Sequence, residues 1–110
     1  MGTDSHLTPR PQEAAVLAVH RLRALGSADE QVTAELSELI DVLATQPGFR
    51  YARAGRCLDE PDVWLLLSEW NSVGTYRRAM SSHAVKTSGY PVFIRVVDEP
   101  GASELVLGTG

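Results

Sequence analysis

Apolar and polar side chains follow strand spacing and then helix spacing in the first part of the chain. Residues 14–25 alternate between two sets of side chains, which predicts a β-strand that ends at Gly26. Ser27 and Glu30 then match a capping box, so a helix is expected to begin there. Its apolar residues recur at steps of four, seven, eight and eleven and share one face: Val32, Leu36, Leu39, Ile40 and Leu43.

The middle of the chain predicts a hairpin followed by a second helix. Residues 49–58 and 63–70 are rich in strand-forming residues, and the turn sequence at 59–62 indicates that the two strands are antiparallel neighbours. In the first of these strands, Phe49, Tyr51 and Arg53 are expected on one face. The second helix is predicted to begin near Ser72.

Part of the last third of the chain could form either a helix or a strand. Residues 85–96 have apolar side chains at helical spacing, but the overlapping segment 91–97 is rich in strand-formers. A breaker at 98–101 precedes a short final strand predicted at 104–107. The order β-α-β-β-α-(α or β)-β predicts an α+β fold of the ferredoxin-like, split βαβ type, in which an antiparallel sheet carries its helices on one face.

Both faces of the predicted strands carry apolar residues. In the third strand Trp64 and Leu66 lie on one face, and Val63, Leu65 and Leu67 lie on the other. A sheet with one face in water normally alternates apolar with polar residues. We therefore expect a homodimer in which the bare faces of two sheets cover each other.

Composition and charge narrow the class of protein. The chain has 110 residues, enough for one domain, which we place at 14–108 after an N-terminal tail expected to be disordered at 1–13. A net charge of −4 argues against a nucleic-acid partner. No apolar stretch is long enough to span a membrane and no signal-peptide pattern is present, so a cytoplasmic location is expected.

Metal and nucleotide chemistry find no support in the sequence. The single Cys57 excludes an intramolecular disulfide and a cysteine-based metal site, and no pair of histidines has metal-ligand spacing. The glycines do not follow a phosphate-binding pattern. No cofactor and no metal are expected.

The junction between the hairpin and the second helix carries a family resemblance. Phe49 after Pro47-Gly48, the run 65–72 ending in Trp70-Asn71-Ser72, Tyr76 six residues after that tryptophan, and Ser81-Ser82-His83 resemble the antibiotic biosynthesis monooxygenase domain over roughly residues 14–107. The resemblance implies a dimeric α+β barrel and a cofactor-independent oxidation of anthrone-type aromatic polyketides to quinones by dioxygen. It also favours a helix for 85–96.

The same resemblance suggests site residues. Trp70 and Tyr76 stand where the best-studied type of anthrone oxygenase has its pocket tryptophan and tyrosine. Leu66 stands in place of the expected asparagine, Gly55 near the expected histidine, and Tyr90 near the expected arginine.

Other candidate residues come from the chain itself. His20 lies among apolar neighbours in the first strand and is a candidate base. Seven residues make almost two helical turns, so Met80 and His83 are expected on the face of Tyr76. Candidate substrate-binding residues are Tyr51, Arg53, Trp64, Leu66, Met80 and Tyr90, and candidate catalytic residues are His20, Trp70, Tyr76 and His83.

Three functions remain open at this point. The first is a monooxygenase whose partners are a small aromatic molecule and dioxygen. The second is a polyketide cyclase, in which His20 or His83 moves a proton. The third is a non-catalytic accessory protein that holds an intermediate of a polyketide biosynthetic complex.

Overall fold

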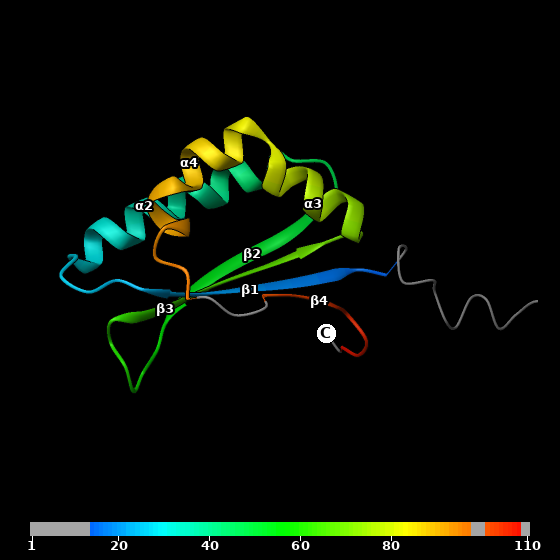
Figure 1. Cartoon of the computed structure of the whole chain (residues 1–110). Coiled ribbons are helices and arrows are strands. Elements are labelled where there is room, and N and C mark those ends of the chain that lie inside the picture. The colour runs from blue at the N-terminus through cyan, green and yellow to red at the C-terminus, as the bar shows by residue number, and fades with distance from the viewer. Residues whose placement is uncertain (1–13, 98–100, 109–110) are drawn as a thin grey trace, which may run out of the picture.

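A four-stranded antiparallel sheet with helices on one face makes up the part of the chain described by the computed structural model, residues 14–97 and 101–108 (Figure 1). The predicted N-terminal tail lies outside the described residues. The elements are β1 (Val16–Arg23), α2 (Asp29–Leu43), β2 (Phe49–Arg56), β3 (Val63–Trp70), α3 (Val73–Ser81), α4 (His83–Phe93) and β4 (Ala102–Glu104).

The strand order is β2-β3-β1-β4, so the central strands are β3 and β1. They pair along their full length, from Val16 opposite Trp70 to Arg23 opposite Val63. The helices α2, α3 and α4 lie on the same face of this sheet (Figure 1). This topology is the ferredoxin-like plan predicted from the order of the elements.

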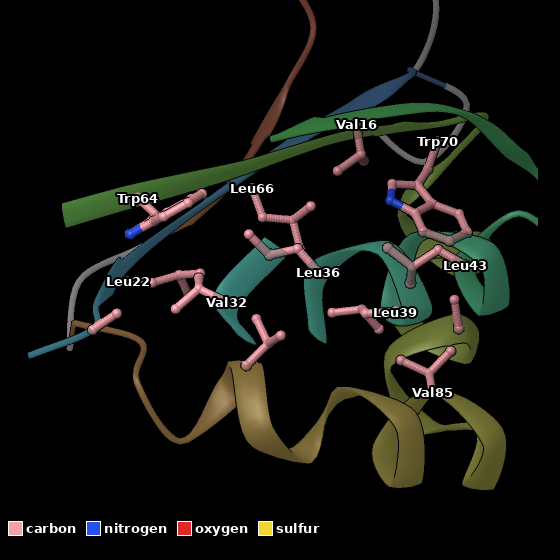
Figure 2. Packing of buried hydrophobic residues seen from close by; sticks show 13 residues of the cluster. Val16, Leu22, Val32, Leu36, Leu39, Leu43, Trp64, Leu66, Trp70 and Val85 are labelled. Carbon is pink, nitrogen blue, oxygen red and sulfur yellow. The ribbon is translucent and has the colours of Figure 1, made fainter. Parts of the chain in front are cut away.

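The core lies between the central strands and α2. Val32, Leu36, Leu39 and Leu43 of α2 are each at most 2% exposed, which confirms the apolar helix face predicted from their spacing. Figure 2 shows these side chains between α4 and the sheet residues Val16, Leu22, Trp64, Leu66 and Trp70. Burial of this face holds α2 against the middle of the sheet.

The start of α2 differs from the prediction. Ala28 is the N-cap and no side chain caps the helix, so the predicted capping box of Ser27 and Glu30 does not form. The Ser27 hydroxyl instead accepts a hydrogen bond of 3.1 Å from Nη2 of Arg95, which also pairs with Glu35. A tertiary contact with the segment after α4 has replaced the local cap.

The ambiguous segment after Ser82 is a helix, as the family resemblance implied. Ser82 has an extended backbone (φ −70°, ψ 146°), which ends α3, and its hydroxyl accepts from the amide of Val85 (3.1 Å) at the start of α4. The strand-forming residues beyond α4 are used differently: Val96 forms an isolated antiparallel bridge with Leu22 of β1.

The final strand is shorter and earlier than predicted. β4 covers Ala102–Glu104 rather than 104–107, and it pairs with the first residues of β1. Leu105 still donates its amide to the carbonyl of Ala15 (2.7 Å), but Val106 and Leu107 are exposed. The pairing of this segment with the sheet therefore ends at Leu105.

A β-bulge in β2 changes which side chains share a face. The register with β3 shifts between Phe49 and Tyr51, so Phe49 lies opposite Trp70 on the helix side. Tyr51 and Arg53 lie opposite Glu69 and Leu67, on the face without helices. The prediction that Phe49 shares a face with Tyr51 and Arg53 is therefore wrong, because one extra residue reverses the alternation.

The face of the sheet without helices is partly apolar. Val19 is 37% exposed, and Leu17, Leu65 and Leu67 are half-buried. This agrees with the expectation of apolar residues on both faces, and the homodimer stays a prediction. No helix within the described residues is long and apolar enough to cross a membrane.

Gly48 gives a test of how the hairpin is joined to α3. Gly48 has φ +84°, its carbonyl accepts from Asn71 (2.8 Å), and a methyl group there would overlap the side chain of Thr75. Gly26 also has a positive φ (+74°) but open space around it. We expect Gly48→Ala to cost about 2–4 kcal/mol of unfolding free energy and Gly26→Ala only about 1–2 kcal/mol. Urea denaturation of both variants checks this, and equal losses would contradict the predicted overlap.

Candidate active site

A groove lies between α2 and the edge strand β2. It has a volume of about 650 Å³ and is lined by Thr33, Leu36, Ser37, Ile40 and Asp41 of α2, by residues 52–56 of β2, and by Trp64 of β3. This volume is within the range of about 300–1,000 Å³ typical of small-molecule sites.

Small side chains on β2 leave this groove open. Ala52 and Ala54 lie opposite Ser68 and Leu66 of β3, on the face that carries the helices. They are too short to reach α2, which is held over the sheet centre by its own apolar face. The groove is therefore a consequence of pairing a well-anchored helix with an alanine-bearing edge strand.

The two ends of the groove carry opposite charges. Thr33, Ser37 and Asp41 follow one another at four-residue steps and form a polar rim that ends in a carboxylate. Arg56 lies at the opposite end, where it pairs with Asp29 at the start of α2. Its Cζ atom is 5.8 Å from the centre of the Trp64 ring, within cation–π distance.

Trp70 lies in the core and outside this groove. Its side chain is fully buried, and its ring makes edge contacts with Phe49 (5.4 Å) and Tyr76 (6.2 Å). Its Nε1 donates to Oγ of Ser68 at 3.0 Å, so its hydrogen-bond donor is already used. The family resemblance implied a pocket position for Trp70, but in this structure the protein's own side chains enclose its ring.

Tyr76 borders a separate, smaller pocket. This pocket of about 240 Å³ lies between α3, β1 and β4, and Val16 and Glu104 also line it. Burial raises the pKa of the Tyr76 phenol above its usual value, so the phenol is neutral at physiological pH. Met80 is half-buried and packs against the core.

His20 faces the helix layer beneath α4. Its ring centre is 5.5 Å from that of Phe93, and its Nδ1 atom is buried without a hydrogen-bond partner among the described residues. Burial lowers the pKa of His20, so the imidazole is neutral at physiological pH and able to accept a proton. His20 does not line the groove beside α2.

Three other sequence candidates lie apart from both sites. His83 begins α4 and is exposed, with Nε2 3.4 Å from Oγ1 of Thr87, because the break at Ser82 interrupts the helical face expected to join it to Tyr76. Tyr90 is 65% exposed. Leu66 is buried in the core.

Tyr51 lines a third cavity on the face without helices. This cavity of about 630 Å³ is bordered by Leu17, Glu69 and residues 105–108. Glu69 forms an ion pair with Arg50, with 2.9 Å between Oε2 and Nη1. A hydrogen bond to Glu69 raises the pKa of the Tyr51 phenol. The guanidinium of Arg53 lies 5.9 Å from the Tyr51 ring centre.

Of the ten residues selected from sequence, only Arg53 and Trp64 line the groove. The polar rim of α2 was missed. Its signal was present as polar side chains at four-residue intervals beside the apolar face, opposite the small residues of β2. In the part of the chain that the structure describes, no three His, Cys, Asp or Glu side chains form a group able to hold a metal.

Comparison with known proteins identifies the same architecture. The family model of the antibiotic biosynthesis monooxygenases matches residues 15–88. The structure is similar to SnoaB, a cofactor-independent oxygenase from Streptomyces nogalater, at 19% identity over 86% of this chain and 96% of that chain, with a TM-score of 0.76. No curated protein matches the sequence.

Two further solved structures share the fold. Rv0793 from Mycobacterium tuberculosis is 14% identical, with 88% of this chain and 98% of that chain covered and a TM-score of 0.68. A conserved protein from Methanosarcina mazei is 15% identical, with 84% and 92% covered and a TM-score of 0.68.

The lowered pKa of His20 predicts a pH-dependent stability. The unfolded chain has a histidine pKa of about 6.5. Below that pH the unfolded chain binds a proton at His20 that the folded chain binds less readily, because burial lowers the His20 pKa in the folded state. The free energy of unfolding is therefore not reduced by this residue above pH 6.5, and it decreases as the pH falls below that value. His20→Phe should show a smaller loss of unfolding free energy between pH 7.5 and 5.5 than the natural chain, whereas the exposed His83→Gln should not. Identical losses in the natural chain and His20→Phe would contradict the burial of His20.

Proposed function

Because the chain belongs to the antibiotic biosynthesis monooxygenase family, we propose that it is a cofactor-independent monooxygenase. Its substrate in this proposal is an anthrone-type aromatic polyketide, which dioxygen oxidises to a quinone in antibiotic biosynthesis. The observation that carries the proposal is the groove between α2 and β2, which is large enough for a planar polycyclic molecule.

The walls of the groove suit a flat aromatic ligand. Ala52 and Ala54 provide a low apolar floor, and the indole of Trp64 offers a ring against which another ring can pack. Leu36 and Ile40 supply apolar contacts from α2. Thr33 and Ser37 place hydroxyl groups on the rim, where they can donate hydrogen bonds to carbonyl or phenolate oxygens.

The chemistry requires few protein groups. In the oxidation of an anthrone, the ring methylene loses two hydrogens and becomes a carbonyl, one oxygen atom of dioxygen enters that carbonyl, and the other leaves as water. All four electrons come from the substrate. The protein has to accept the first proton and stabilise the resulting enolate oxygen, which is a task for one base and nearby donors.

We assign the base to Asp41, since this residue lines the groove and His20 does not. Ser37, one helical turn before Asp41, is the nearest rim hydroxyl along α2 and is suited to donate to the enolate oxygen. Trp70 and Tyr76 then act by packing: with Phe49 they form a continuous set of ring contacts that fixes the end of β3.

Oxygen dependence tests the proposed reaction. We expect purified protein to accelerate conversion of 1,8-dihydroxyanthrone to its quinone under air, above the uncatalysed rate, with one dioxygen consumed per anthrone. No conversion is expected under argon. Loss of water from a poly-β-ketone without oxygen would instead identify a cyclase, and tight anthrone binding without turnover would identify an accessory protein.

The position of the base can be tested separately. Asp41→Asn should lower kcat by about a hundredfold, because removal of a general base typically costs that much or more. Asp59→Asn is the matched control, since Asp59 is exposed in the turn between β2 and β3. Full activity of Asp41→Asn, together with loss of activity in His20→Gln, would move the base to His20.

A further inference from the structure

We propose that the groove selects aromatic ligands with an anionic substituent, and that Arg56 binds this substituent. The inference rests on the proposed use of the groove as the substrate site. It adds a chemical class, a carboxylate-bearing or similarly anionic aromatic, and an orientation for the ligand.

The position of Arg56 is determined by the strand and by the indole beneath it. Arg56 lies opposite Trp64 in the pairing of β2 with β3, and both side chains are on the face that carries the helices. The guanidinium carbon is 5.8 Å from the centre of the Trp64 ring. An aromatic ligand that packs beside this indole would therefore have a cation at its edge.

Arg56 has hydrogen-bonding capacity to spare. A guanidinium carries five N–H donors, and among the described residues its only hydrogen-bond partner is the Asp29 carboxylate, contacted through Nη1. The side chains of Arg56 and Asp29 are 43% and 60% exposed, and exposed ion pairs of this kind contribute little to stability. A ligand carboxylate can therefore share the guanidinium with Asp29 or displace it.

The opposite charges of Asp41 and Arg56 favour one orientation of an anionic ligand in the groove. Asp41 lies near the end of α2, and Arg56 is paired with the first residue of that helix. An anionic substituent is attracted to Arg56 and repelled by Asp41. The opposite edge of the ligand then lies beside Asp41, where the proposed function requires the reacting carbon.

Arg53 is not the residue that performs this task. It also borders the groove, but its position opposite Leu67 directs it to the face without helices, and its guanidinium lies 5.9 Å from the ring centre of Tyr51. The choice of Arg56 over Arg53 is a consequence of the strand alternation after the bulge in β2.

Two matched quinones test the inference without turnover. Anthraquinone-2-carboxylate and 2-(hydroxymethyl)anthraquinone have nearly the same shape but differ in charge. Titration calorimetry should show that the carboxylate binds the natural chain about tenfold more tightly or better, as expected for charge-assisted hydrogen bonds. Arg56→Gln should remove this preference and leave the affinity for the neutral quinone unchanged.

Asp29→Asn provides a variant with the opposite expected effect. Removing the competing carboxylate should tighten binding of anthraquinone-2-carboxylate by severalfold, whereas Arg78→Gln, an exposed arginine of α3, should change neither affinity. Failure to fold would lower binding of both quinones, so it cannot imitate these results.

The inference is overturned if Arg56→Gln weakens both quinones equally, if it changes neither, or if the natural chain binds neither. Oxygen-dependent anthrone conversion combined with an unaltered preference in Arg56→Gln would refute the inference and leave the proposed function standing. Charge-selective binding that depends on Arg56, without any oxygen-dependent conversion, would refute the proposed function and leave the inference standing.

Discussion

The anchoring of α2 over the centre of the sheet is the constraint on which the rest of the structure depends. Four buried apolar side chains on one helix face pack onto β3 and β1, and they leave the helix no freedom to approach β2. In the middle of the edge strand, the side chains directed toward the helices are those of Ala52 and Ala54. Close packing in the core and an open groove at the edge therefore have the same cause, since short side chains cannot fill the space beside a helix that is already fixed.

The comparisons with known proteins describe the fold of this chain but not its candidate site. The family match and the similar structures describe a sheet with helices on one face, and identities below 20% leave the groove to be argued from this chain alone. In this chain the rings of Trp70 and Tyr76 contact each other, and the groove beside α2 is lined by other polar groups, those of Thr33, Ser37 and Asp41. The chemistry proposed for the groove is compatible with this shift, because the substrate supplies the electrons and the protein supplies a base and hydrogen-bond donors.

Local sequence patterns predicted most of the helices and strands. They did not predict how elements distant in the sequence contact one another. The helix face of α2 was predictable because helical spacing is a property of the segment itself. The bulge near Arg50 and the break at Ser82 were not, since one inserted residue or one extended backbone conformation hardly changes the composition of a segment. The bulge places Tyr51 on the opposite face of the sheet from Phe49, and the break at Ser82 separates His83 from the helix face of Tyr76. The groove depends on how α2 lies relative to β2, which no single segment encodes.

A map of the bound ligand tests the central claim most directly. Backbone amide shifts of isotope-labelled protein, followed by NMR during titration with anthraquinone-2-carboxylate, report which residues the ligand approaches. The account predicts the largest changes at Ser37, Asp41 and Ala54, together with the indole N–H of Trp64. Changes centred on Ser103 and Tyr76, or on Leu17 and residues 105–108, would place the ligand in one of the other two cavities and contradict it.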